Sequence, residues 1–264
     1  MMTLPTLAPE IVGHFGSFPI SNTFIGSLGT LVVVVLLALA YNRVAIITHI
    51  LDLAGEGLLT LFDQATKSRE LSLSLFPFVG GIFLFILLSN WLGLMPGVGS
   101  LVVRVKEEGH LVNIPIFRGA STDLNLTLAL SLVAVILSHI VGILAIGFFK
   151  YVGKFVQLGA IFKALKSLSP IAIFAAFVEG FVGILEAFSE AAKVLSLSLR
   201  LFGNVFAGEV LLTVMSGLFA YALPLPFIAL ELLVGVVQAT VFAMLVIVYF
   251  SIALSDPHGA NQKH

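Results

Sequence analysis

Long apolar runs recur along this chain and limit the folds that are open to it. Three of them cover residues 23–41, 75–96 and 124–149. A helix needs about 20 predominantly apolar residues to cross the hydrocarbon core of a bilayer, and each run meets or nearly meets that length. The composition agrees, because 10% of the 264 residues are charged, against about 25% in an average soluble domain. We therefore expect an all-α polytopic membrane protein embedded in a lipid bilayer.

The segment 43–70 differs from these runs, because polar residues recur in it at every third or fourth position. On a helix this spacing gathers them into one stripe, with apolar residues on the other side. We interpret the segment as an amphipathic helix on the membrane surface; the alternative is an ordinary helix packed in a loop domain. The polar residues of the stripe are His49, Asp52, Glu56, Thr60, Asp63 and Lys67.

Residues 171–223 contain no proline and predict one long helix. Such a helix would measure roughly 80 Å at 1.5 Å per residue, against a hydrocarbon core of about 30 Å, so it must tilt strongly. The letters "YALPLPF" mark a break, after which residues 227–255 predict a final long helix. We thus expect about five membrane helices and one surface helix in a single membrane domain, residues 1–264. Its last two membrane helices, within 171–255, are expected to be strongly tilted.

Basic residues favour one orientation of these helices. The N-terminal segment 1–22 has neither Lys nor Arg, and the connection 97–123, which could form a hairpin, has few. Most of the basic residues fall in 43–70, in the connection 150–170 and in the tail 256–264. Since Lys and Arg collect on the cytoplasmic side of a membrane, we expect the N-terminus outside and the C-terminus inside.

The predicted long helix carries charged and amide side chains at spacings of 7, 4, 3, 7 and 4 residues, which place them on one face. Lipid cannot satisfy such a face, so it must meet protein, a cavity or water. Small residues beside it would let another helix or subunit approach closely. The polar residues are Glu179, Glu186, Glu190, Lys193, Arg200 and Asn204, and the small ones are Ser189, Ser196, Gly203 and Ala207.

Three more polar residues complete this pattern. Glu209 lies nine residues after Arg200, on the opposite side of the helix, so the two cannot form a simple ion pair. Glu231 and Gln238 share a face of the final helix, about 10 Å apart. These groups either form ion pairs that tie helices together or line an ion path. The extent of the stripe favours an ion path, in which carboxylates exchange protons and Arg200, which stays charged, forms a barrier.

His139 lies in the third apolar run, where it either lines a wet cavity or is a satisfied structural histidine. The other histidines show no metal-ligand spacing, and the sequence holds no phosphate loop or dinucleotide fingerprint. Cysteine is absent and the formal net charge is -1, which gives no argument for binding nucleic acid. We expect no cofactor, no metal site and no nucleotide site in this chain.

Several motifs resemble, in the same order along the chain, those of the a subunit of F-type ATP synthases. The most specific is "SLSLRLFGNVFAGE", residues 196–209. The others are "FPISNTF" at 18–24, "SNWLGLMPG" at 89–97, "TDLNLTLALSL" at 122–132 and "ELLVGVVQATVFAMLVIVYFS" at 231–251. The resemblance therefore covers nearly the whole chain.

This resemblance implies a stator subunit of the membrane sector of ATP synthase, which couples proton flow to ATP synthesis. Protons would enter by one half-channel, ride on carboxylates of a rotating c-ring and leave by the other. Arg200 would face those carboxylates and prevent a direct leak. The implied partners are c-ring subunits, b-type peripheral stalk subunits and other ATP synthase subunits. Glutamate at both 209 and 231 resembles bacterial or plastid members of the family, which implies a bacterial inner membrane or a thylakoid.

The resemblance also implies positions along this route. Outer half-channel residues would be Asn204, Glu209, Glu231 and Gln238, with Asp123 near the outer opening; inner ones would be Glu186 and Ser196; further candidates for cavity lining are His139, Glu179, Glu190 and Lys193.

Some alternatives stay open. The ion could be sodium instead of the proton. A stand-alone secondary transporter would predict a repeat of membrane helices, and we find none; a purely structural membrane anchor is the third alternative. The depth of Gln238 is open as well. A simple hairpin count places Gln238 level with Glu209, whereas the resemblance places it nearer Arg200.

Overall fold

The computed structural model describes residues 6–95, 101–107, 110–155, 170–218 and 224–254. The expected inner tail, 256–264, and most of the connection 150–170 lie outside the described residues. The described part confirms an all-α polytopic membrane protein, with six helices that are long and apolar enough to cross a bilayer. They are α1 Asn22–Tyr41, α2 Ala45–Thr66, α3 Arg69–Leu94, α4 Leu124–Ile146, α7 Pro170–Leu218 and α8 Pro224–Leu254.

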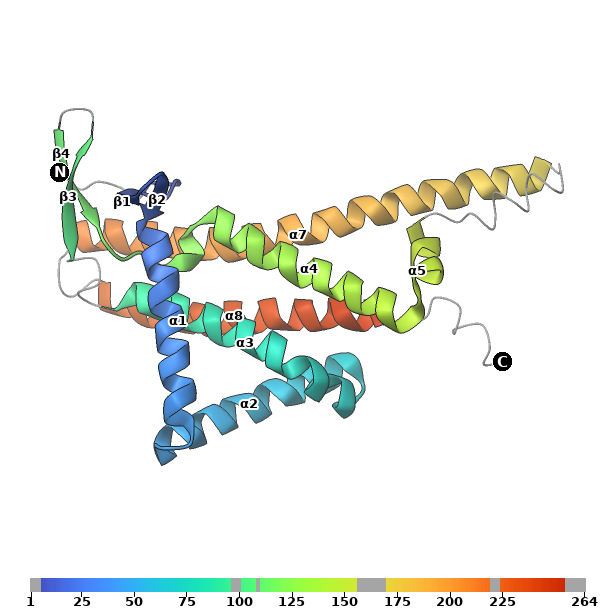
Figure 1. Ribbon diagram of the computed structural model, residues 1–264, viewed down its shortest axis with the longest axis horizontal. Coiled ribbons are helices and arrows are strands. Elements are labelled where there is room, and N and C mark those ends of the chain that lie inside the picture. The colour runs from blue at the N-terminus through green and yellow to red at the C-terminus, as the bar shows by residue number, and fades with distance from the viewer. Residues whose placement is uncertain (1–5, 96–100, 108–109, 156–169, 219–223, 255–264) are drawn as a thin grey trace.

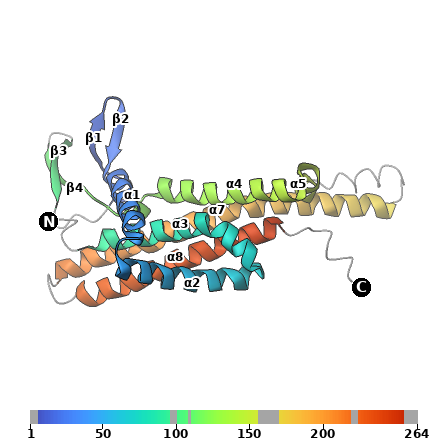
Figure 2. The ribbon, with the colours of Figure 1, turned by 60° about the horizontal axis from the view of Figure 1, so that its bottom comes forward.

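Helices α3, α4 and α7 surround α8, and α8 forms the centre of the fold. Figures 1 and 2 show these four helices running side by side, with α1 crosswise to them. The inward face of α8 carries the completely buried side chains Phe242, Val246, Ile247 and Phe250. Lipid is as apolar as these side chains, so membrane helices associate mainly through close van der Waals packing and interhelical hydrogen bonds. This tightly packed face therefore fixes how α8 sits against its neighbours.

The helix α7 is continuous over 49 residues, as its lack of proline predicted. At 1.5 Å per residue it is roughly 74 Å long, more than twice the thickness of a hydrocarbon core. Both views show α7 and α8 crosswise to α1, and the first part of α7 reaching beyond the other helices. This arrangement agrees with the strong tilt expected of the last two helices.

Several helix boundaries differ from the sequence expectation, and two of them fall at residues with positive φ. The third apolar run was expected to reach residue 149, but α4 ends at Ile146 because Gly147 adopts φ +94°, and the short helix α5 follows at Phe148–Phe155. The segment 43–70 was expected to be one helix, but α2 ends at Thr66. Lys67 is left-handed there, with φ 57°.

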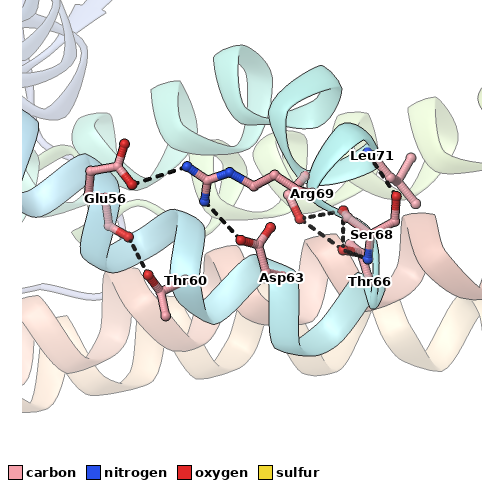
Figure 3. A network of polar contacts seen from close by, with 8 residues as sticks. Glu56, Thr60, Asp63, Thr66, Ser68, Arg69 and Leu71 are labelled. Carbon is pink, nitrogen blue, oxygen red and sulfur yellow. Dashed lines mark hydrogen bonds and ion pairs between the residues drawn. The ribbon is translucent and has the colours of Figure 1, made fainter.

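The corner between α2 and α3 is held by a polar network. Figure 3 shows Arg69, the first residue of α3, reaching back to α2. Its guanidinium donates to Asp63 at 2.8 Å and to Glu56 at 3.1 Å, while the Ser68 hydroxyl caps α3 by accepting from the Leu71 amide. Part of the predicted polar stripe of α2 therefore binds the start of α3. The position of α2 on the membrane surface stays a prediction.

Two β-hairpins lie near the end of the bundle where α7 ends and α8 begins (Figure 1). β3 Val102–Glu107 pairs antiparallel with β4 His110–Pro115, which confirms the hairpin expected in 97–123. β1 Ile11–Phe15 pairs with β2 Phe18–Ser21 and was not expected. The segment after β4 contains a short 3₁₀ turn, η2 Ala120–Thr122, and packs between α1, α3 and α7.

Gly26 sets how closely α1 approaches this segment. A methyl group at Gly26 would collide with the backbone carbonyl oxygen of Arg118, and a backbone atom cannot move aside as a flexible side chain can. We expect Gly26→Ala to lower the free energy of unfolding by about 1–3 kcal/mol, the usual range for overpacking. The measurement is the thermal unfolding midpoint of the purified protein in detergent.

Gly57→Ala is the matched control. Gly57 lies on exposed α2 with open space around it, so a methyl group there should leave the midpoint unchanged or raise it through better helix propensity, by up to about 1 kcal/mol. Equal midpoints for the two variants would contradict the close approach at Gly26.

Candidate functional site

A cavity of about 580 Å³ opens between α3, α7, α8 and the segment that follows β4. It contains both carboxylates that the motifs singled out, Glu209 of α7 and Glu231 of α8, together with Gln238. Its other polar lining residues include Ser89, Asn90, Arg118, Thr122, Thr213 and Ser216. The fold thus brings these three predicted site residues, from two helices, into one space.

Arg118 is the partner of Glu209. Its Nε donates to Glu209 Oε1 at 2.9 Å and its Nη2 donates to Oε2 at 2.8 Å, a bidentate pair. The same Nη2 also donates to the carbonyl oxygen of Thr6 at 3.0 Å. The Arg118 side chain is 5% exposed and that of Glu209 29%. The pair is therefore mostly shielded from solvent, where charge-assisted hydrogen bonds are strong.

Sequence reasoning did not identify Arg118 as a site residue and counted it only as a charge of the outer connection. The two partners are 91 positions apart in the chain, so no local spacing could have joined them. The one available signal was Glu209 itself, because a carboxylate in an apolar helix needs a partner.

The carboxylate of Glu231 packs against α7 at Gly208, the residue that precedes Glu209. Any side chain at Gly208 would collide with the Glu231 carboxylate, so the absence of a side chain there lets the two helices meet around that group. Glu231 and Glu209 consequently open into the same cavity from neighbouring positions on facing helices.

Gln238 lies level with Asn204, whose Nδ2 donates to Gln238 Oε1 at 2.6 Å. This settles the open depth in favour of a position nearer Arg200. The simple hairpin count was wrong because it centred the turn on "YALPLPF", whereas α8 begins at Pro224. An earlier start of α8 shifts its register against α7 and moves Gln238 away from the level of Glu209.

Unsatisfied amide groups face this cavity. Within the part of the chain that is described, Gln238 Nε2 and both polar atoms of the Asn90 side chain are buried without a hydrogen-bond partner. Buried polar groups are nearly always satisfied, by protein or by water, and the cavity is far larger than one water molecule requires. The arrangement can therefore hold water beside Gln238.

Arg200 lies on a face of α7 that the described helices leave uncovered. It is exposed, as are Ser196, Gly203, Asn204 and Ala207. Across the described residues Arg200 makes no hydrogen bond and no ion pair. The geometry agrees with the prediction that Arg200 and Glu209 do not form an ion pair. Within the described chain, no ion pair accounts for the presence of this arginine.

Towards the start of α7, the polar stripe meets other helices. Glu190 accepts from Lys193 at 2.6 Å, and its other oxygen lies 3.4 Å from Nε2 of His139 on α4. The hydroxyl of Tyr151 on α5 lies 2.6 Å from Nδ1 of the same histidine. We call these four residues the inner cluster, after the side of the membrane on which the sequence predicts them. Burial, reinforced by Glu190 and Glu186, raises the pKa of Tyr151 above its usual 10.0, so its hydroxyl stays protonated at neutral pH.

The remaining predicted residues have separate places. Glu186 lines the small cavity next to the inner cluster, while Glu179 is half-buried nearer the start of α7. Asp123 caps α4 by accepting from the Asn125 amide at 2.9 Å, and it accepts from the Thr23 hydroxyl at 3.1 Å. Its expected place near an outer opening stays a prediction. Among the described residues no group of three or more His, Asp or Glu could hold a metal ion.

Comparison with known proteins agrees with this architecture. A family model described as ATP synthase A chain matches residues 23–251. A protein of Acidothermus cellulolyticus named ATP synthase subunit a is 32% identical over 207 residues, 76% of this chain and 64% of that protein. A relative with the same name from Campylobacter concisus is 29% identical over 95% of this chain and 96% of its own length. One from Mycobacterium tuberculosis is 35% identical over 67% of this chain and 62% of that protein.

The chain spans less than two thirds of the length of the Acidothermus and Mycobacterium relatives and nearly all of the Campylobacter relative. The match to the family model covers most of the chain, from α1 to the last turn of α8. The chain is therefore an integral membrane protein that belongs to the ATP synthase A chain family, as a bacterial-like subunit of the membrane sector of an F-type ATP synthase.

Proposed function

We propose that this chain is the stator half of a proton path, with two offset half-channels that meet a ring of c subunits at Arg200. One observation carries the proposal: α7 presents an uncovered arginine between an outer cavity and an inner polar cluster. The other expected partners are b-type stalk subunits and the remaining ATP synthase subunits. The proposed setting is a bacterial inner membrane, with the N-terminus outside, and a thylakoid is the alternative.

The outer route runs from Glu209 and Glu231 towards the face of Arg200. Gln238 lines the cavity and binds Asn204, and Asn204 is exposed on the uncovered face of α7. These two amides therefore bridge the cavity and the surface on which a ring would turn. A proton that enters the cavity needs only to pass this amide pair to reach a ring carboxylate.

Arg200 suits a barrier because its charge is permanent. A charge at the centre of a membrane helix costs about 2.5–3.5 kcal/mol on insertion scales, which a carboxylate of a neighbouring subunit would offset. A proton that slipped directly from one half-channel to the other would waste about 2.3 kcal/mol per 100 mV. A fixed positive charge opposes that shortcut and forces protons to travel on the ring.

Arg118 gives the outer route a fixed geometry. Its bidentate bond holds the carboxylate of Glu209 at the cavity wall and ties it to the N-terminal segment through Thr6. We assign to Arg118 the role of a positioning residue, which keeps Glu209 beside Glu231. Two alternatives compete with the whole proposal: sodium as the ion, which sodium-dependent pumping would reveal, and a stand-alone transporter, which uptake by the purified chain alone would reveal.

Arg200→Ala tests the proposal. We expect ATP-driven acidification of inverted membrane vesicles that contain the complete complex to fall to background, because the barrier and the partner of the ring carboxylate are both lost. Arg43→Ala, at an exposed arginine after α1, is the matched control and should pump normally. Coupled pumping that survives in the Arg200 variant would overturn the proposal.

A double-mutant cycle tests the Arg118–Glu209 pair. Breaking a buried pair from one side costs about 3–5 kcal/mol, and the partial exposure of Glu209 places Arg118→Met near the lower figure. The variant Arg118→Met with Glu209→Gln should be more stable than the sum of the single changes, because neither charge is left alone. The measurement is the unfolding midpoint in detergent together with the pumping rate.

The control for the cycle is Arg104→Met, because Arg104 is exposed on β3 of the same connection. It should change neither quantity. Strictly additive effects of the two substitutions would mean that the pair does not stabilise the protein.

A further inference from the structure

We propose that His139 and Glu190 form a proton-exchanging pair that carries protons between the ring-facing surface of α7 and the inner compartment. The inference rests on the proposed function and adds to it a specific inner-side route. It concerns a different part of the molecule from the outer cavity, and different residues carry it.

The first observation is the bridging position of His139. Its Nδ1 lies 2.6 Å from the Tyr151 hydroxyl and its Nε2 lies 3.4 Å from Glu190 Oε2. Helices α5, α4 and α7 thus contribute one polar group each to a continuous chain. Since histidine has an ordinary pKa near 6.5, it exchanges protons readily at neutral pH when it has such neighbours.

The second observation is the space beside this chain. A cavity of about 20 Å³ is lined by the inner cluster together with Glu186 and Tyr249, which is enough for about one water molecule. The side chains of His139, Glu190 and Lys193 are 26%, 20% and 21% exposed. They are therefore shielded enough to hold fixed geometry and open enough to trade protons with water.

The third observation connects this cluster with Arg200. Glu190 precedes Arg200 by ten residues, about 15 Å along the helix axis. Tyr249 of α8 adjoins the cluster on this side: its ring is 5.3 Å from Lys193 Nζ, and it lines the same small cavity as Glu190. The pair is thus placed between the ring-facing arginine and the inner end of α7.

The proton step needs no movement of the backbone. With the Tyr151 hydroxyl donating to Nδ1, the neutral imidazole carries its proton on Nε2, directed at Glu190. A proton taken up at Nδ1 gives an imidazolium that donates to Glu190 from Nε2 and to the Tyr151 oxygen from Nδ1, while the hydroxyl hydrogen turns to water. Loss of one ring proton to water or to Glu190 restores the neutral ring, so atoms and charge balance.

A structural role is the competing explanation, and the small stability gain expected of such an ion pair argues against it. A partly exposed ion pair contributes about 0–1 kcal/mol to stability, which packing between α4, α5 and α7 could supply without ionisable groups. The described charged and titratable groups that face His139 are Tyr151 from α5, Glu186, Glu190 and Lys193 from α7, and Tyr249 from α8. Such a concentration of exchangeable groups suits proton transfer better than helix packing.

The test measures passive proton conduction through the complete membrane sector in inverted vesicles from which the soluble sector has been stripped. An imposed potassium diffusion potential drives conduction while the pH on the inner side, which faces the medium, is varied from about 6 to 9, to bracket the usual titration of histidine. His139→Asn keeps a polar group near Nδ1 but cannot titrate. We expect its conduction to fall about a hundredfold, the lower end of what a positioned proton-transfer group contributes, and its pH dependence near neutrality to disappear.

Glu190→Gln is the second variant and should lower conduction in the same way. It tests the inference even if His139→Asn fails to assemble. His49→Asn is the matched control, because His49 is exposed on α2 and outside the cluster, and it should behave as wild type. The inference would be overturned if His139→Asn assembles and keeps wild-type conduction and pH profile, with only its unfolding midpoint lowered. If Arg200→Ala abolishes pumping while His139→Asn conducts normally, the proposed function stands and the inner route fails alone.

Discussion

The polar side chains of α7 need hydrogen-bond or ion-pair partners that lipid cannot provide. The contacts that satisfy them determine how the other helices pack around α7. Glu209 is met by Arg118, Asn204 by Gln238, and Glu190 by Lys193 and His139. Arg200 alone among the charges of the central motif has no ion-pair partner within the described chain. A single helix thus supplies internal contacts and an exposed arginine without an ion-pair partner in the described chain, and the proposed function assigns to that arginine a carboxylate of another subunit.

Helix α8 converts these contacts into a defined register. Its fully buried face, from Ala239 to Phe250, packs against the neighbouring helices, so it cannot slide without opening cavities, and a Leu→Ala-sized cavity already costs about 2–5 kcal/mol. Gln238 immediately precedes this face and therefore stays opposite Asn204. Gly208 lets the Glu231 carboxylate approach α7 one residue before Glu209. Apolar packing further along the same face of α8 consequently positions these polar contacts.

Periodicity and proline content were enough to predict the membrane helices and the unbroken α7, because both depend on local chain properties. The ends were harder: Gly147 stops α4 three residues early, and Lys67 ends α2 in a left-handed conformation that is uncommon for lysine. The two carboxylates of the cavity were found through their motifs. Arg118 could not be, because its contact with Glu209 spans 91 positions, and the β1–β2 hairpin is too short to give a clear alternation.

The two sides of Arg200 differ in size, and this difference bears on mechanism. The cavity at Glu209 and Glu231 holds about 580 Å³ and is lined by amide atoms without a hydrogen-bond partner in the described chain, so in the proposed path water would carry protons there. The cavity beside the inner cluster holds about 20 Å³, room for about one water molecule. In the proposed inner route, side chains would provide most of the steps, and the neighbouring groups with exchangeable protons are those around His139. In the proposed path, a wide wet entrance and a narrow exit through side chains would let protons reach the ring freely, while the exit rate would depend on the inner pH.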